Sequence, residues 1–241
     1  MGRASSKKPS VRDPRSAIGT HDPTADERLL DTMTDFIDSD PWRVLRIQSE
    51  FVNGFDTLAG LGPAVTIFGS ARTPEEAPIY QAAVETARLL AQEGLAIITG
   101  GGPGIMEAAN RGAQLGDGLS VGFAIELPFE EAANPYVDVG ITFCYFFVRK
   151  TMFVKYAQAF VIFPGGFGTM DELFEALTLI QTGKIHDFPV ILYGSDYWGG
   201  LVEWLQATML ERGNISSEDL ELLVVVNTPE EARDYLKEKM A

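Results

Sequence analysis

The sequence has few of the side chains on which most catalytic and metal centres depend. Among its 241 residues there is a single cysteine, Cys144, and there are two histidines, His21 and His186. One cysteine excludes an intramolecular disulfide framework and a cysteine zinc site. Two histidines argue against a Ser-His-Asp triad or a multi-histidine metal centre. Because Cys144 stands in the apolar segment ITFCYFF, we interpret it as an inert core thiol.

Positive charge is also scarce. The chain has 19 Lys and Arg residues against 34 Asp and Glu residues, which gives a formal net charge of −15. Such a surface repels the phosphate backbone of nucleic acids, and no local basic patch in the sequence offsets it. A small anionic ligand remains compatible with this charge, because backbone N–H groups and one or two arginines can hold it locally. We therefore expect no nucleic-acid partner.

Long apolar runs are missing as well. No stretch approaches the roughly 20 residues of a membrane-spanning helix, and the basic, polar N-terminus has no apolar core of a secretory signal. We therefore expect no membrane partner and a cytoplasmic protein. The hydrophobic fraction of 46% and the charged fraction of 22% are ordinary for a globular protein. The length is sufficient for one large domain with a sizeable core.

The N-terminal quarter differs from the rest of the chain in composition. Residues 1–25 are rich in Ser, Pro, Gly and charge and offer almost nothing to bury, which predicts a disordered tail. Apolar residues at helical spacing follow over Asp26–Ile37 and Trp42–Leu58, with Pro41 as a suitable first-turn residue. We predict a helical extension over residues 26–60 and a single domain over residues 61–241.

From residue 61 onward, apolar runs typical of strands alternate with helical patterns. This alternation predicts an α/β fold with a doubly wound, mostly parallel sheet of about seven strands and helices on both faces. The predicted strands cover residues 64–68, 95–99, 119–125, 141–146, 159–163, 189–193 and 222–226. Glycine-bearing loops follow three of them, at Gly69, Gly100–Gly104 and Gly165–Gly168. We expect these loops to open on one edge of the sheet, where ligands bind in such folds.

The third of these loops combines several features of an anion site. The run AFVIF ends at Pro164, and Gly165, Gly166 and Gly168 precede the helical pattern DELFEALTLI. A strand, a glycine turn and a helix N-terminus together direct free N–H groups and the helix dipole at a ligand. Thr169 and Glu172 have two interpretations. Thr-x-x-Glu at a helix start can be a capping box, or Glu172 can be a carboxylate that a bound substrate needs.

The second loop invites comparison with the dinucleotide-binding fingerprint G-x-G-x-x-G. Read from Gly102, the last glycine of that fingerprint is replaced by Glu107, so the match is weak. Glu126, at the end of the next predicted strand, stands where an acid that binds ribose would be expected, which keeps a dinucleotide ligand open. The fingerprint should, however, follow the first strand of the fold. No glycine loop ends in Gly-Lys-Ser/Thr, so the Walker pattern is not met.

Two adjacent cations, Arg149 and Lys150, stand at the start of a predicted helix. Positive charge there opposes the helix dipole, so another group should offset it. That group can be one of the many carboxylates or solvent, or it can be a bound anion. The sequence around the pair leaves both alternatives open.

The string PGGFGTMDE resembles the PGGxGTxxE signature of the LONELY GUY (LOG) family. These hydrolases release the base from cytokinin nucleoside 5′-monophosphates and have often been labelled lysine decarboxylases. The segment GGGPGIM and the Arg149-Lys150 pair are similar to two further segments of the family, and the resemblance covers roughly Val65 to Ile185. Phe146-Phe147-Val148 replaces the Met-His-x of the shorter plant-like members, so the chain is more similar to a longer bacterial subgroup.

The resemblance implies that Arg149 and Glu172 are catalytic. Hydrolysis of an N-glycosidic bond needs an activated water and negative charge near an oxocarbenium-like ribose, which Glu172 would supply, while Arg149 would anchor the nucleotide. The domain over residues 61–241 would be a Rossmann-like nucleotide-binding domain without metal or cofactor. The implied substrate-binding residues are Ser70, Arg72, Gly101, Gly102, Glu130, Lys150, Gly165, Gly166, Phe167, Gly168, Thr169, Asp171 and Thr178.

The resemblance also implies partners. The small-molecule partner would be a nucleoside 5′-monophosphate, either AMP or a cytokinin riboside 5′-monophosphate, and the chain would form at least a homodimer or a ring of dimers. An alternative is a non-catalytic binding protein, because the wider superfamily includes molybdenum-cofactor carriers. Lysine decarboxylation is disfavoured, because it requires pyridoxal phosphate on a Schiff-base lysine. Lys155 and Lys184 are more simply surface residues of helices.

Overall fold

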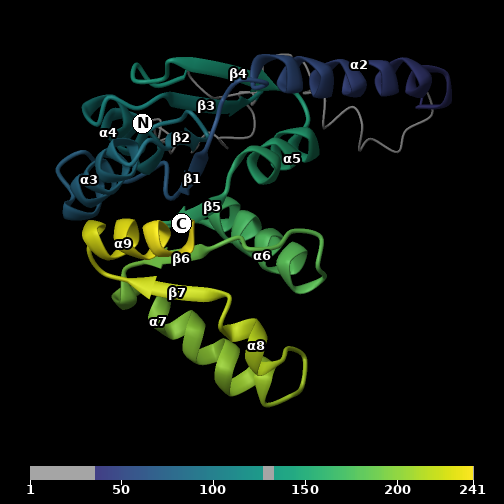
Figure 1. The fold of residues 1–241 in the computed structure, drawn as a ribbon. Helices are drawn as coiled ribbons and strands as arrows, with labels where there is room; N and C mark the ends of the chain where they lie inside the picture. The colour runs from purple at the N-terminus through teal and green to yellow at the C-terminus, as the bar shows by residue number, and fades with distance from the viewer. Residues whose placement is uncertain (1–35, 127–132, 241) are drawn as a thin grey trace, which may run out of the picture.

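The structure is a computed structural model that describes residues 36–126 and 133–240 (Figure 1). The predicted tail, nearly all of the predicted helix at 26–37 and the candidate Glu130 lie outside these residues. Seven strands form one sheet in the order β4-β3-β2-β1-β5-β6-β7, and every neighbouring pair is parallel. The predicted α/β fold is therefore confirmed, with a sheet that is wholly parallel.

The strands are short and begin within two residues of the predicted positions. They are β1 (Ala64–Phe68), β2 (Ala96–Thr99), β3 (Ser120–Ile125), β4 (Val139–Phe143), β5 (Ala159–Ile162), β6 (Val190–Tyr193) and β7 (Leu223–Val226). All residues of the central strands β1 and β5 are buried, as expected for β-branched and aromatic runs that are covered on both faces. The edge strands β4 and β7 are only partly buried.

Helices cover both faces of this sheet. They are α2 (Phe36–Thr57), α3 (Pro78–Gln92), α4 (Ile105–Leu115), α5 (Phe146–Tyr156), α6 (Phe167–Gln181), α7 (Ser195–Trp204), α8 (Ser217–Leu220) and α9 (Pro229–Lys239), and a π-helical turn, η2 (Leu205–Leu210), continues α7. None of the helices in the described ranges is long and apolar enough to cross a membrane.

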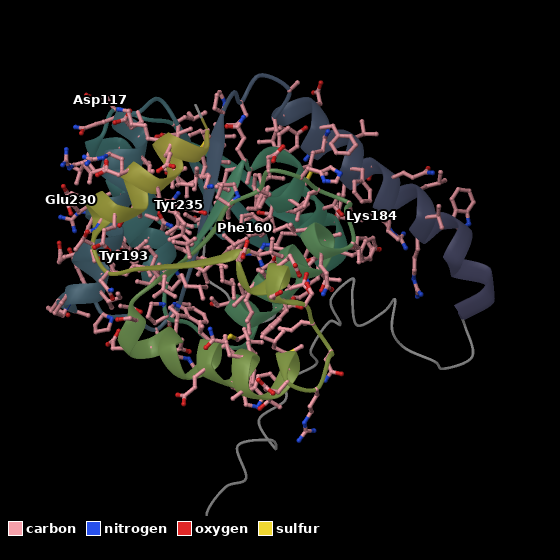
Figure 2. The ribbon with its side chains drawn as sticks, turned by 60° about the horizontal axis from the view of Figure 1, so that its bottom comes forward. Asp117, Phe160, Lys184, Tyr193, Glu230 and Tyr235 are labelled. Carbon is pink, nitrogen blue, oxygen red and sulfur yellow. The ribbon has the colours of Figure 1, made fainter. Side chains whose placement is uncertain are left out.

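Alternate residues of each strand serve two separate cores. Val65 and Ile67 pack with α3, α4 and α9, whereas Phe68 and Phe160 pack with α5, α6 and the buried Trp198 of α7. Figure 1 shows the corresponding division, with α3, α4 and α9 on one side of the sheet and α5 and α6 on the other. Figure 2 shows Phe160 inside the molecule, while the exposed Lys184 lies at its surface.

The order in which the chain adds strands to the sheet reverses between β1 and β5. From β1 the chain builds outward through β2, β3 and β4, and from β5 it builds the other way through β6 and β7. The two strands are hydrogen-bonded neighbours, with Val65 opposite Ala159. The loops that follow them diverge at this switch point, which is where a parallel sheet opens a crevice for ligands.

The N-terminal extension differs from its prediction in one respect. Helix α2 is already helical at Phe36, the first described residue, so Pro41 lies within the helix rather than in its first turn. In Figure 1, α2 runs alongside α5 and continues beyond the edge of the sheet. Its contact with α5 links the extension to the helix that carries Arg149.

Candidate functional site

The three glycine loops meet at the carboxyl ends of their strands, as expected. The Ser70 N–H donates to the carbonyl of Pro164 (3.0 Å), and the Ile105 N–H donates to the carbonyl of Ser70 (3.0 Å). Gly104 permits the second bond, because its φ is +68° and a Cβ there would collide with the Ser70 carbonyl. The loops after β1, β2 and β5 therefore form one structural unit.

The first loop contributes the two predicted contacts Ser70 and Arg72. The Ser70 Oγ accepts a hydrogen bond from the Arg72 N–H (3.1 Å), which closes a local turn. Arg72 is exposed and Ser70 is half-buried beside the other two loops. Ser70 therefore has the turn-forming role, and its hydroxyl hydrogen stays available for a ligand in the same unit.

A buried amide network holds the second loop, Gly100–Gly104. Asn110 of α4 is fully buried; its Oδ1 accepts from the Thr99 hydroxyl (2.6 Å) and its Nδ2 donates to the Ser120 hydroxyl (2.8 Å). The Asn134 Nδ2 lies 3.1 Å from the Gly101 carbonyl oxygen, 2.9 Å from that of Gly102 and 2.9 Å from the Asn110 Oδ1. The carbonyls of Gly101 and Gly102 are thus turned toward Asn134.

Sequence reasoning missed both asparagines of this network. A signal was present for Asn110, because it follows Ala108 and Ala109 on a helix whose other buried residues are Ile105, Gly112 and Ala113. A buried amide must find hydrogen-bond partners, so such a residue indicates a polar network. The Asn134 Oδ1 accepts from the nearby Tyr136 N–H (3.1 Å), which indicates only a local turn, and the network partners of its Nδ2 lie 24 and more residues away.

Arg149 of α5 reaches the ends of β2 and β3. Its Nε donates to the Phe123 carbonyl (2.7 Å) and its Nη2 lies 3.4 Å from the Gly100 carbonyl oxygen. The guanidinium also stands 5.2 Å from the ring centroid of Phe153, a cation–π contact. A Cβ on Gly100 would lie 2.5 Å from the Arg149 Nη2. The glycine at position 100 therefore makes room for the arginine.

Lys150 connects α5 to α6. Its Nζ is 2.8 Å from the Asp171 Oδ2 and 2.7 Å from the Glu175 Oε2, and its side chain is 16% exposed. Burial lowers the pKa of Lys150, but hydrogen bonds with Asp171 and Glu175 outweigh this effect, so the pKa is raised overall. Lys150 is therefore a permanent cation. Glu175, which lies one turn after Asp171, is a part of the site that sequence reasoning did not name.

Glu172 occupies the most unusual environment among the candidates. It is 8% exposed, and its Oε2 is buried without a hydrogen-bond partner among the described residues. Burial raises the pKa of Glu172 from 4.5 to about 7; Lys150 and Arg149 oppose this increase, whereas Glu175 and Asp171 add to it. Because buried polar atoms almost always have a partner, an unpartnered carboxylate with a raised pKa marks Glu172 as a candidate for the functional site.

The capping-box interpretation of Thr169 and Glu172 is wrong. Helix α6 begins at Phe167 with Gly166 as its N-cap, and no side chain caps it. Thr169 and Glu172 therefore both lie inside the helix. The N-cap residue, Gly166, lies three positions before Thr169. The helix has therefore already begun when the chain reaches Thr169 and Glu172, and neither side chain caps it.

The turn Gly165–Gly168 has the geometry of an anion cradle. The Tyr197 hydroxyl of α7 donates to the Gly165 carbonyl (2.6 Å). In a trans peptide the next N–H points away from that carbonyl, so the Gly166 N–H is directed away from Tyr197. It joins the first N–H groups of α6, which have no partner inside the helix. Gly166, Phe167 and Gly168 are exposed, and sequence reasoning missed Tyr197 as their support.

An open hollow of about 600 Å³ lies on the exposed side of α6. Its predicted members are Lys150, Phe167, Asp171 and Thr178. The Thr178 hydroxyl donates to the Phe174 carbonyl of its own helix (2.7 Å), so its observed role is structural. Met170, Phe174, Glu175 and Leu179 complete the lining.

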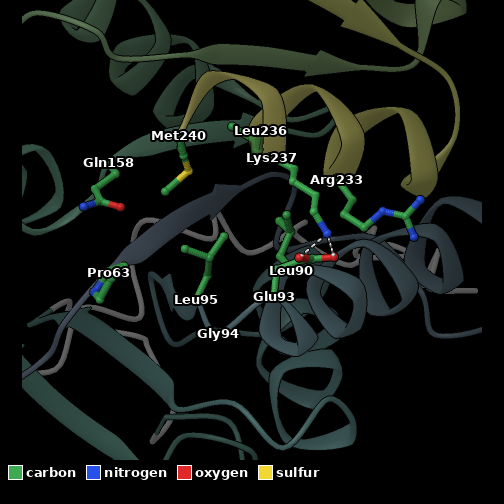
Figure 3. Close-up of a pocket in the computed structure, with 10 residues that line it drawn as sticks. All are labelled: Pro63, Leu90, Glu93, Gly94, Leu95, Gln158, Arg233, Leu236, Lys237 and Met240. Atoms are coloured by element: carbon green, nitrogen blue, oxygen red, sulfur yellow. Dashed lines mark hydrogen bonds and ion pairs between the residues drawn. The ribbon is translucent and has the colours of Figure 1, made fainter.

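A second cavity, of about 420 Å³, lies at the amino ends of β1 and β2, on the opposite side of the sheet from the glycine loops (Figure 3). It is bordered by Pro63 before β1, Leu95 before β2 and the last turns of α3 and α9, where Lys237 pairs with Glu93. None of the candidate residues lines it. No group of three or more His, Cys, Asp or Glu side chains within 36–126 and 133–240 is placed to hold a metal ion.

Comparisons with known proteins agree with this geometry. A family described as "Possible lysine decarboxylase" matches residues 106–236, just over half of the chain. The chain is 34% identical to a cytokinin riboside 5′-monophosphate phosphoribohydrolase of Mycobacterium tuberculosis over 67% of its length and 87% of the relative. It is 38% identical to the phosphoribohydrolase LOG3 of Arabidopsis thaliana, over 37% of its own length and 41% of that protein.

Solved structures with this fold include the molybdenum cofactor carrier protein of Chlamydomonas reinhardtii. The TM-score is 0.56 at 23% sequence identity, and the match covers 74% of this chain and 98% of the carrier. At this level of identity the likeness shows the shared fold alone.

Proposed function

Since the chain belongs to the LONELY GUY (LOG) family, we propose that it hydrolyses the N-glycosidic bond of nucleoside 5′-monophosphates. The products are the free base and ribose 5-phosphate, and AMP and cytokinin riboside 5′-monophosphates are the proposed substrates. The observation that carries this proposal is the buried, unpartnered carboxylate of Glu172 beside two cations and one turn after a glycine cradle.

Glu172 is the proposed general base. A water molecule beside its carboxylate attacks C1′ of the ribose as the bond to the base nitrogen breaks, and the bonding electrons leave with the base. Glu172 takes a proton from the water, and the base nitrogen is protonated by solvent. The pKa of about 7 suits this role, because a base is most effective when its pKa lies near the working pH. The ionised form also stabilises the positive charge that develops on the ribose.

Arg149 and Lys150 have different proposed roles. Both lower the pKa of Glu172 and so keep part of it ionised near neutral pH. Lys150 is held by Asp171 and Glu175 and acts through its charge. Arg149 contacts the backbone carbonyls of Phe123 and Gly100 at the ends of β3 and β2, and a guanidinium is suited to recognise an anionic nucleotide. We propose Arg149 as the second catalytic residue.

The 5′-phosphate is proposed to bind at Gly165–Thr169. Free N–H groups and the positive end of the α6 dipole favour a phosphate there. Binding energy from this remote group positions C1′ against Glu172 and the water, so nucleosides without the phosphate should be poor substrates. Gly101 and Gly102 of the second loop and Ser70 of the first are placed in the same unit to contact the remainder of the nucleotide.

We also propose that the chain forms at least a homodimer. Several large apolar side chains are exposed: Trp42 of α2 is 66% exposed, Val52 of α2 66% and Phe167 of α6 96%. Phe146 and Phe147 at the start of α5 are exposed as well. Apolar side chains in such numbers are typical of a surface that a partner covers. The proposed substrates are charged and do not cross membranes unaided, so we propose that the enzyme works in the cytoplasm.

Two other activities fit the site less well. A molybdenum-cofactor carrier would share the fold, but it has no need of a base with a pKa near 7. A lysine decarboxylase needs a lysine that loses its proton, whereas the pKa of Lys150 is raised by two carboxylates. The other lysines of the described residues, namely Lys155, Lys184, Lys237 and Lys239, are exposed.

The direct test is base release from a panel of nucleotides. The purified protein is incubated with AMP, with N6-isopentenyl AMP and with the two corresponding nucleosides, and bases and ribose 5-phosphate are separated by chromatography. We expect release from the monophosphates and little from the nucleosides. Absence of release from every nucleotide, together with a pterin that co-purifies with the chain, would replace the hydrolase by a carrier.

A further inference from the structure

One residue of the N-terminal helix contacts the start of the helix that carries Arg149. The Glu50 Oε1 of α2 accepts a hydrogen bond from the Cys144 N–H (3.0 Å), and its Oε2 accepts one from the Tyr145 N–H (3.4 Å). Tyr145 is the N-cap residue of α5 and has no side-chain cap of its own. Glu50 therefore accepts from the backbone N–H of the N-cap, as the carboxylate of a capping box does, but from another part of the chain.

The Glu50 carboxylate lies at the N-terminus of the helix that carries Arg149 and Lys150. Arg149 and Lys150 follow directly on the first turn of α5, where positive charge opposes the helix dipole. A carboxylate at this N-terminus interacts favourably with the dipole. The same environment affects Cys144, because burial and hydrogen bonds with Glu50 and Glu126 raise the pKa of its thiol to about 12. The thiol therefore stays protonated near neutral pH.

Helix α2 holds α5 at further points along its length. Gly54 lies so close to Met152 that an added Cβ would be 2.9 Å from the Met152 Cε. At the other end of α5, the Tyr156 hydroxyl is 3.4 Å from the Phe55 carbonyl oxygen, and the Lys155 Nζ stands 5.2 Å from the Phe55 ring centroid. The contact with Glu50 differs from these, because it fixes the end of α5 from which Arg149 extends.

We infer that Glu50 is a positioning residue that fixes the start of α5 and thereby the place of the Arg149 guanidinium at the Phe123 and Gly100 carbonyls. The N-terminal helix is then a part of the catalytic scaffold. This inference rests on the proposed function, since it assigns Glu50 to the same site. It is local, because Arg149 follows Tyr145 by only four positions, about one helical turn, and a shift of the helix start moves Arg149 directly.

The test compares Glu50→Ala and Glu50→Gln with Asp56→Asn, an exposed carboxylate on the same helix. Turnover is measured per folded molecule, with thermal denaturation monitored in parallel. Displacement of a catalytic group by about 1 Å can cost about 100-fold in rate, so we expect about that loss for Glu50→Ala. Glu50→Gln keeps one acceptor oxygen and should lose less, and Asp56→Asn should match the wild type.

The pH profile separates positioning from simple structural support. Arg149 and Lys150 lower the pKa of Glu172, while Asp171 and Glu175 raise it. If α5 shifts in Glu50→Ala, the two cations move away and the acidic limb of the turnover profile should move to higher pH. A Glu50→Ala protein that melts earlier but keeps wild-type turnover per folded molecule and an unchanged acidic limb would overturn the inference.

A second measurement keeps the inference testable if the wild type hydrolyses no nucleotide. In that case the proposed function fails, and amide hydrogen exchange and AMP binding decide the role of Glu50. Glu50→Ala should exchange faster at residues 144–150 and bind AMP more weakly than Asp56→Asn. Unchanged exchange and unchanged binding would contradict the positioning role, whatever the reaction is.

Discussion

Two helices within residues 36–126 and 133–240 carry the pattern Thr-x-x-Glu near their starts, and the environments of the two glutamates differ. At the start of α9, Thr228 and Glu231 form a capping box: the Thr228 Oγ1 accepts from the Glu231 N–H (3.2 Å), and the Glu231 Oε2 accepts from the Thr228 N–H (3.3 Å). In α6, Thr169 and Glu172 lie within the helix and are buried. The Glu231 carboxylate is thus satisfied at the surface, whereas an oxygen of Glu172 is buried without a partner.

The difference follows from the residues that precede each pattern. Before α9 the chain enters the helix at Thr228 itself, followed by Pro229, and the side chains must satisfy the free N–H groups. Before α6 the glycines bring the backbone into the helix earlier, and the N–H groups stay free for a ligand. The same four letters therefore indicate a cap in one place and a candidate catalytic carboxylate in the other.

The largest expected effect is on turnover. Glu172→Gln removes the proposed base while keeping the size of the side chain, and general base catalysis contributes about 10²–10⁴-fold, so we expect base release from AMP to fall by about 1,000-fold. Glu231→Gln is the matched control and should leave turnover unchanged. The measurement is steady-state base release with both variants confirmed as folded by circular dichroism. Equal turnover in Glu172→Gln and the wild type would show that Glu172 is no more catalytic than the capping residue Glu231.

An intermediate effect is expected on pH dependence. The folded-state pKa of Glu172 is raised from 4.5 to about 7, so the protonated form is favoured in the folded protein. The stabilisation that this proton provides is complete below about pH 4.5 and is lost as the pH rises through about 7. Glu172→Gln should therefore be more stable than the wild type above pH 7, by urea denaturation, and Glu231→Gln should not.

Turnover should rise with pH over the same range, from about pH 4.5 to above pH 7, in which the stabilisation by the Glu172 proton is lost. A proposed base with a pKa of about 7 must lose its proton to act, so turnover should rise through pH 7 and fall about tenfold per pH unit well below it. A stability difference between Glu172→Gln and the wild type that does not change between pH 5 and pH 8 would contradict the raised pKa.

The smallest effect concerns the threonines. Thr228→Ala removes a cap and should cost about 1 kcal/mol of stability without any effect on turnover. Thr169→Val keeps the size of the side chain and removes no cap, so its effect should be on the binding of the phosphate rather than on unfolding. Urea denaturation and the KM for AMP measure the two effects. A loss of stability in Thr169→Val as large as in Thr228→Ala would restore a capping role in α6.

Much of the fold could be predicted because its determinants are local. The β-branched run before Pro164 and the glycines after it define a strand, a turn and a helix within about twenty residues. Parallel strands then place all such loops on one edge, which brought Ser70, Gly101 and Gly165 into one unit as predicted. Arg149 and Glu172 were named from a family motif, and their roles stay a proposal.

The residues that sequence reasoning missed are held by non-local contacts. Glu50 binds the backbone of Cys144 and Tyr145, more than ninety positions later, through groups that every residue possesses. Tyr197 binds the Gly165 carbonyl in the same way. A side chain that binds backbone leaves no matching side chain elsewhere in the sequence, so only the three-dimensional register of α2, α5 and α7 reveals the pair.

The reversal of strand order between β1 and β5 has a consequence for when, during folding, the crevice can form. Val65 is paired with Ala159, more than ninety positions later, so the strand that precedes the glycine turn pairs with β1 across a long stretch of chain. Pairings of such long sequence separation are slow to form. Because Pro164 and Ser70 meet only across this pairing, a partly folded chain has no crevice. Turnover therefore requires the pairing of β1 with β5, and its recovery can report on this step of refolding.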